Sequence, residues 1–195
     1  LFNNLGSIYS QSKQFDKAIV LFNESIKKFP KSLDAYTNLA NIFVIKGKND
    51  IAKSILNKTI ELNPKFLKAY SNLASIYVGE GNLKKAEFLL RKSFEINPKD
   101  INTLVNLACV LKDLENPKQS EIFLRDALEI NPNFDFALIN LGAILNELGK
   151  IHEGEEYLRK ALKINPNSPI ALNNLGNILT KKNNNKDAEI CYRKA

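Results

Sequence analysis

The feature that most constrains the fold of this chain is a strict period of 34 residues. Prolines recur at this interval, and the positions around them keep the same register along all 195 residues. They are Pro30, Pro64, Pro98, Pro132 and Pro166. A period of this length indicates an array of short structural units, because each unit alone is too small to bury its own apolar surface. The sequence therefore predicts six stacked copies of one unit.

Apolar and small residues recur within each copy at helical spacing. The first half of each copy contains a leucine column: Leu5, Leu39, Leu73, Leu107, Leu141 and Leu175. It is followed directly by a small-residue column: Gly6, Ala40, Ala74, Ala108, Gly142 and Gly176. The second half has its own small-residue column: Ala18, Ala52, Ala86, Ser120, Gly154 and Ala188. We predict two amphipathic helices per copy, joined by turns at Gly47, Gly81 and Gly149 and ended by the proline.

The two small-residue columns predict a close crossing of the two helices within each copy. Larger residues then fill the space between a copy and its neighbour. Ser120 and Gly154 depart from alanine in the second column but remain small. On helix propensity alone, Gly154 is expected to cost its helix up to about 1 kcal/mol relative to alanine.

These columns resemble the tetratricopeptide repeat family, in which a Leu–Gly/Ala pair, a second-helix alanine and a closing proline recur every 34 residues. The resemblance covers the whole chain and implies an all-α fold, an α-solenoid of antiparallel helix pairs wound as a right-handed superhelix. Its first helices are expected to line a concave groove. We predict one array with six repeats, the first and last of them truncated: 1–32, 33–66, 67–100, 101–134, 135–168 and 169–195.

The two ends of the chain fall inside helical patterns. Leu1 does not look like a native start, and no polar capping helix follows at Ala195. We therefore interpret the sequence as a piece of a longer protein, and we expect its apolar ends to associate with one another.

An asparagine stands immediately before the leucine in every copy. This column comprises Asn4, Asn38, Asn72, Asn106, Asn140 and Asn174. Asparagine is a mediocre helix former, so its presence six times within a helix calls for a compensating interaction. Its amide can pair with both the N–H and the C=O of a peptide backbone, or it can bond a neighbouring repeat and set the repeat angle. The sequence leaves both interpretations open.

The segments TNLANIF (37–43), SNLASIY (71–77) and LNNLGNI (172–178) resemble the repeats of O-linked N-acetylglucosamine transferases. In that family a concave asparagine ladder grips protein substrates by their backbone, and peptide receptors of the peroxisomal import type also use concave asparagines. The resemblance implies that the asparagine column binds peptide. The positions beside it add Asn3, Asn41, Asn173 and Asn177 to the predicted peptide-binding set. Val105, Phe136 and Ile139 are expected to face the same groove and to offer an apolar anchor.

Other chemistry finds little support in the sequence. The lysines behind the net charge of +7 are scattered, and the first-helix face lacks a basic or aromatic stripe, which argues against nucleic acid. No uncharged apolar segment is long enough for a membrane span. Cys109 and Cys191 lack metal-type spacing. His152 is expected near the start of a helix. An exposed surface is expected for Glu153, Glu155 and Glu156. No nucleophile–base pair, metal site or cofactor is predicted, and a reducing, cytoplasmic location fits.

We therefore predict a non-enzymatic protein–protein interaction scaffold. It would bind an extended peptide or a partner protein in the concave groove through the asparagine ladder. The alternative is a substrate-recognition arm of a larger, glycosyltransferase-like enzyme whose catalytic domain lies outside these residues.

Overall fold

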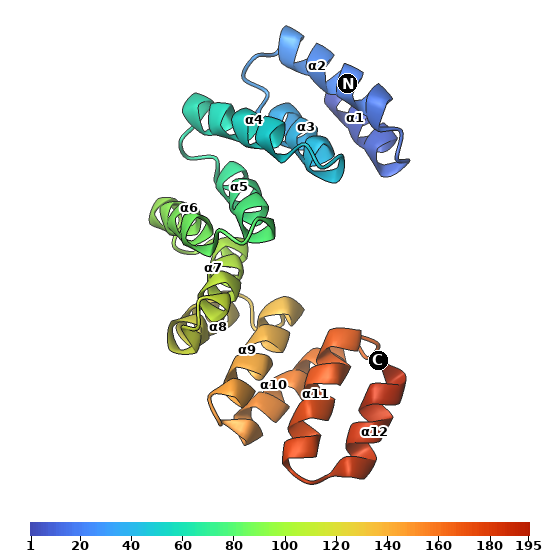
Figure 1. The fold of residues 1–195 in the computed structure, drawn as a ribbon, viewed down its shortest axis with the longest axis vertical. Helices are drawn as coiled ribbons and strands as arrows, with labels where there is room; N and C mark the ends of the chain where they lie inside the picture. Colours follow the sequence, from blue (N-terminus) through green and yellow to red (C-terminus); the bar gives the residue numbers. More distant parts are fainter. The chain divides into compact units, whose positions relative to one another are not determined.

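A computed structural model describes all residues from Leu1 to Ala195 and is entirely α-helical. The helices form two compact units, unit 1 from Leu1 to Asn97 and unit 2 from Pro98 to Ala195. Within each unit every helix folds back against its predecessor, so that the helices form antiparallel pairs (Figure 1). The fold class predicted from the sequence, an α-solenoid of helix pairs, is confirmed, whereas one array continuous through both units stays a prediction.

Unit 1 contains three helix pairs. They are α1 (Phe2–Gln11) with α2 (Phe15–Lys28), α3 (Leu33–Ile45) with α4 (Asn49–Leu62), and α5 (Leu67–Gly79) with α6 (Leu83–Ile96). The first helices of successive pairs also touch, α1 against α3 and α3 against α5.

Unit 2 repeats this arrangement. Its pairs are α7 (Ile101–Asp113) with α8 (Pro117–Ile130), α9 (Asp135–Glu147) with α10 (Ile151–Ile164), and α11 (Pro169–Lys181) with α12 (Asn185–Lys194). Helix α9 touches both α7 and α11.

The turn inside each pair requires one residue with a left-handed backbone. Gly47, Gly81 and Gly149 adopt φ values of 70°, 74° and 78°, which confirms them as turn residues. The same turn position in the other three repeats is occupied by Lys13, Glu115 and Asn183, with φ between 57° and 60°. Residues with a Cβ enter this region at a cost, so these turns are held by the packing of the helices on either side.

The core of each repeat forms where its second helix packs against its first helix. Five successive second helices place one fully buried large residue in the core, exposed by at most 1%: Phe22, Leu56, Leu90, Leu124 and Leu158. The alanines of the second small-residue column are buried to a similar degree. Close packing of this kind is sensitive to a single methylene, so the two columns must be matched in size.

The match is visible between the first small-residue column and the large residue opposite. Where the column holds alanine, the opposing residue is leucine, as in Ala40 with Leu56. Where an aromatic ring opposes it, the column holds glycine. A Cβ on Gly6 would lie 2.7 Å from a ring carbon of Phe22, and one on Gly176 would lie 2.5 Å from a ring carbon of Tyr192. Glycine thus makes room for the larger ring.

The pair α9–α10 crosses more closely because both columns hold glycine. A Cβ on Gly154 would lie 2.8 Å from the backbone oxygen of Gly142, and a Cβ on Gly142 would lie 2.6 Å from Cγ of Leu158. The helix-propensity cost expected for Gly154 is therefore offset by a backbone approach that alanine would block.

Candidate functional site

The asparagine column lies on one face of the first helix of each repeat, which we call the A face. In α9 this face contains Phe136, Ile139, Asn140 and Ala143, spaced three and four residues apart so that they point the same way. The equivalent residues of α7 and α11 complete the A face of unit 2, and those of α1, α3 and α5 form the A face of unit 1.

In unit 1 the asparagines bond across repeats. Nδ2 of Asn38 donates to Oδ1 of Asn3 at 3.2 Å and lies 3.4 Å from Oγ of Ser7. Nδ2 of Asn72 donates to Oδ1 of Asn41 at 3.0 Å. Each of these asparagines thus ties its first helix to the preceding one, which is the structural role that the sequence left open.

For Asn140 and Asn174 of unit 2, the preceding first helix holds no asparagine or serine at the two positions that accept hydrogen bonds in unit 1. The residues 35 and 31 positions before Asn140 are Val105 and Cys109, and those before Asn174 are Ile139 and Ala143. Asn140 instead donates to the carbonyl of Phe136 in its own helix at 2.8 Å. Because the side chains at those positions are weak acceptors or none at all, Asn140 and Asn174 make no cross-repeat hydrogen bond like those of unit 1.

The additional asparagines predicted for the site divide in the same way. Asn3 and Asn41 are the acceptors of the cross-repeat bonds in unit 1. Asn177 accepts a hydrogen bond at 2.9 Å from the hydroxyl of Tyr192 in α12, while Asn173 is exposed. Asn4 is exposed as well. The structure therefore places the whole predicted set on the A faces, but engages its members unequally.

The apolar residues predicted for the A face also divide into two kinds. Val105 and Ile139 are buried, with exposed fractions of 7% and 8%. Phe136 is 58% exposed, and its ring centroid lies 6.0 Å from that of Phe134. Ile170, which was not predicted for this face, occupies the same repeat position as Phe136 in α11 and is 61% exposed. The repeat register alone could have identified it.

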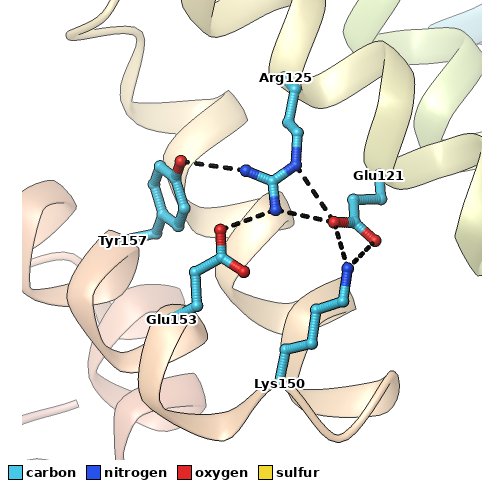
Figure 2. A network of polar contacts seen from close by, with 5 residues as sticks. All are labelled: Glu121, Arg125, Lys150, Glu153 and Tyr157. Carbon is cyan, nitrogen blue, oxygen red and sulfur yellow. Dashed lines mark hydrogen bonds and ion pairs between the residues drawn. The ribbon is translucent and has the colours of Figure 1, made fainter.

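The most extensive polar network of unit 2 lies between second helices, away from the A face (Figure 2). Arg125 of α8 contacts Glu121 and Glu153 at 2.7 Å, and its Nη1 lies 3.3 Å from the hydroxyl of Tyr157. Lys150 contacts Glu121 at 2.7 Å. Burial alone would raise the pKa of Glu121, but hydrogen bonds from Lys150 and Arg125 outweigh it and lower that pKa. The network joins α8 to α10 and is fully paired, so it is structural.

A second ion-pair cluster corrects the expectation for the glutamates of α10. Glu155 is bound by Lys182 and Arg159, each at 2.7 Å, and its side chain is only 12% exposed. The hydrogen bond from Lys182 lowers its pKa most, burial opposes this, and Arg159 adds to the lowering. Glu153 belongs to the network of Figure 2, and only Glu156 lies on an exposed surface as expected. Spacing within one helix could not show that partners arrive from α8 and from the turn after α11.

The charge of the chain is distributed unevenly. Unit 1 has 15 Lys and Arg against 8 Asp and Glu, whereas unit 2 has 13 of each. The entire net charge of +7 therefore belongs to unit 1. On the A face of unit 2, charged residues appear only toward the helix ends, where Lys112 and Glu147 approach to 3.9 Å.

Residues of other chemical classes lie apart from one another. His152 is exposed near the start of α10, with Nδ1 3.5 Å from Nζ of Lys182. Burial raises the pKa of both free thiols, Cys109 and Cys191. No three His, Cys, Asp or Glu residues come together in a way that could hold a metal ion. No helix has the length and apolar character that a membrane crossing requires.

Stacked antiparallel helix pairs of 34 residues define the helical-repeat class of proteins. Four family models, each described as the tetratricopeptide repeat, match residues 9–76, 67–100 with 101–134, 136–168 and 157–190. The chain belongs to the tetratricopeptide repeat family. Proteins of this family mediate protein–protein interactions.

Three solved structures illustrate the fold. YrrB, a tetratricopeptide repeat protein with an unusual peptide-binding site, is 24% identical over 89% of each chain, with a TM-score of 0.68. PilF of Pseudomonas aeruginosa is 17% identical over 98% of this chain and 86% of its own, with a TM-score of 0.84. A thermophilic repeat protein from Thermus thermophilus is 21% identical over 92% of this chain and 97% of its own, with a TM-score of 0.73. No curated protein sequence matches the chain.

Proposed function

We propose that the chain is a protein-interaction scaffold that binds an extended peptide segment of a partner on the A face of its first helices. The observation that carries this proposal is the unequal engagement of the asparagine column. Unit 1 uses its amides internally, whereas Asn140 and Asn174 of unit 2 have no partner on the neighbouring helix. Asn140 uses one N–H within its own helix, which leaves its second N–H and its Oδ1 for a ligand, and a ligand would compensate the low helix propensity of asparagine.

The proposal requires only backbone recognition at the asparagines. A side-chain amide can accept from a peptide N–H and donate to a peptide C=O at the same time. Such pairing holds an extended segment with little regard to its side chains. The resemblance to the transferase ladder and the peptide-binding site of YrrB, a protein of the same fold, support this choice of ligand.

A recognition arm of a larger, glycosyltransferase-like enzyme remains the second candidate. Such an arm would bind the segment on the same face with the same chemistry. It would differ only in presenting the bound segment to a catalytic domain outside residues 1–195. Our proposal for residues 1–195 themselves is binding without catalysis, and a cytoplasmic location is part of that proposal.

The experiment is a peptide selection followed by affinity measurements. The chain is immobilised and used to select binders from a random dodecapeptide display library. Recovered peptides are then titrated, by fluorescence anisotropy, against wild type and against the variant Asn140→Ala/Asn174→Ala. The matched control is Asn23→Ala/Asn57→Ala, which removes two exposed helical asparagines outside the A face.

We expect the A-face variant to weaken binding about tenfold or more, since each lost amide leaves backbone groups of the peptide unpaired. The control should bind as wild type does. Failure to recover any peptide, or equal affinity for wild type and both variants, would contradict the proposal.

A further inference from the structure

We infer that the A face of unit 2 selects an uncharged, extended segment carrying one bulky apolar side chain, which is seated against Phe136 and Ile170. This inference rests on the proposed function and adds its location within the chain and the chemical class of the partner segment.

Two exposed apolar residues stand on neighbouring first helices of unit 2. Phe136 and Ile170 are 58% and 61% exposed, and they stand at the same repeat position on α9 and α11, which touch. A single exposed apolar residue needs no explanation, but two on neighbouring helices of one face form a patch. In unit 1 this repeat position holds Asp34 and Lys68, which approach each other to 3.7 Å. An apolar patch is therefore specific to unit 2.

The apolar patch lies close to the asparagine column along the helix. Buried Ile139 lies one helical turn from Phe136 and directly precedes Asn140. An apolar side chain on the patch would thus leave its own backbone next to the amides of Asn140 and Asn174. Apolar anchor and backbone clamp are adjacent, as binding of one extended segment requires.

The charge of the A face of unit 2 indicates the charge of the segment that it binds. The A face from Phe136 to Ala143, and from Ile170 to Asn177, contains no charged side chain. Unit 2 is neutral as a whole, while unit 1 carries the net charge of +7. An acidic segment would be drawn to unit 1, and a charged side chain brought onto the unit 2 A face would lose hydration without gaining a partner. The surface is therefore complementary to an uncharged segment.

The test uses peptides recovered from the random library on the full chain. They are titrated against Phe136→Ala/Ile170→Ala and against the control Phe88→Ala/Val20→Ala, which removes a similarly exposed aromatic and aliphatic pair from second helices of unit 1. All four residues are more than half exposed, so both variants are expected to keep the helical content of wild type, which circular dichroism checks.

We expect recovered peptides to share one bulky apolar residue with uncharged neighbours. The Phe136→Ala/Ile170→Ala variant should bind them about tenfold more weakly or worse, as loss of a central apolar anchor does in other interfaces. The control should stay within about twofold of wild type, since exposed contacts outside an interface contribute little.

Cys109 provides a second readout without mutation. It lies on the A face in α7, whereas Cys191 lies in the second helix α12. A bound peptide should slow alkylation of Cys109 by a maleimide and leave Cys191 unaffected, as followed by mass spectrometry.

The outcomes separate the inference from the proposed function. Binding that depends on Asn140 and Asn174 but not on Phe136 and Ile170, or that selects acidic peptides, would overturn the inference alone. Loss of asparagine dependence, or no recovered peptide, would overturn both.

Discussion

At the residue scale, one residue type has two roles in this chain, and the neighbouring helix decides between them. Asn38 and Asn72 find acceptors on the preceding first helix and act as cross-repeat ties. Asn140 and Asn174 face Val105 and Ile139 at the equivalent positions, so the same side chain has no cross-repeat partner. A column that is invariant in sequence is therefore not uniform in its hydrogen bonding.

The two roles predict different effects on stability. Asn38→Ala/Asn72→Ala removes three cross-repeat hydrogen bonds, whereas Asn140→Ala/Asn174→Ala removes none between helices. Since the gain in helix propensity is the same, the first variant should have the lower free energy of unfolding by about 1–3 kcal/mol. Urea unfolding followed by circular dichroism measures the difference. Equal stability of the two variants would show that the unit 1 bonds are not structural ties.

Gly154 gives a second prediction at this scale. Helix propensity alone favours alanine there, but a Cβ would lie 2.8 Å from the backbone oxygen of Gly142. We expect Gly154→Ala to destabilise the fold by about 1–3 kcal/mol, because backbone cannot move aside as a flexible side chain can. Gly79→Ala is the matched control, since its Cβ would meet nothing within 4 Å. The control should be neutral or stabilising in thermal unfolding, and a stabilising Gly154→Ala would refute the close crossing.

At the element scale, second helices are joined by ion pairs that approach from different repeats. Glu121 of α8 receives Arg125 of its own helix and Lys150 from the turn before α10. Its side chain is 12% exposed, so loss of its charge would leave Lys150 without its carboxylate and Arg125 with Glu153 as its one remaining carboxylate. The link between α8 and α10 should therefore depend on the ionisation of this carboxylate.

The pKa values of Glu121 and Glu155 are lowered in the folded chain, so their stabilisation has a defined pH dependence. It is present above the unfolded pKa of about 4.3 and is lost as the pH falls through the lower folded values. We expect Glu121→Gln to cost about 1.5–3 kcal/mol at pH 7, as for other hydrogen bonds to charged groups, and to flatten the loss of stability in acid. Chemical unfolding at a series of pH values measures both effects.

The control for this prediction is Glu156→Gln, an exposed glutamate of α10. It should leave both the stability at pH 7 and its acid dependence unchanged. If Glu121→Gln behaves like this control, the network of Figure 2 does not hold α8 to α10.

At the scale of the whole molecule, the two units have different surface chemistry. Unit 1 places lysines over aromatic rings, as with Lys53 and Lys85 beside Tyr77, and carries all of the net charge. Unit 2 has leucine at the repeat position of Tyr77 and balances its charges. A neutral partner segment and a charged one should therefore bind to different units.

The salt dependence of peptide binding tests this division. Between about 0.1 and 1 M salt the Debye length falls from ~10 to ~3 Å, which screens attraction to unit 1 but not apolar contact with unit 2. Peptides recovered on the chain should lose no more than about twofold in affinity over this range. A steep loss, measured by anisotropy, would indicate binding to the lysines of unit 1.

The repeat pattern was enough to predict the helices, the turns at three glycines and the placement of the asparagine column. These follow from period and spacing, which are local. The Gly142–Gly154 approach and the partners of Glu155 follow from packing between elements, which one helix pattern does not contain. Whether an asparagine of the column finds a cross-repeat acceptor depends on the residues 31 and 35 positions before it. A comparison of those positions could have predicted this division from the sequence.

The central claim is that Asn140 and Asn174, which make no cross-repeat hydrogen bond, hold a peptide backbone on the A face of unit 2. The most direct measurement is an NMR titration of the ¹⁵N-labelled chain with a recovered peptide, followed through the side-chain amide signals of asparagine. The account predicts shifts at Asn140 and Asn174, with Asn23 and Asn57 unchanged. Shifts confined to residues of unit 1 or to the second helices, with Asn140 and Asn174 unchanged, would contradict it.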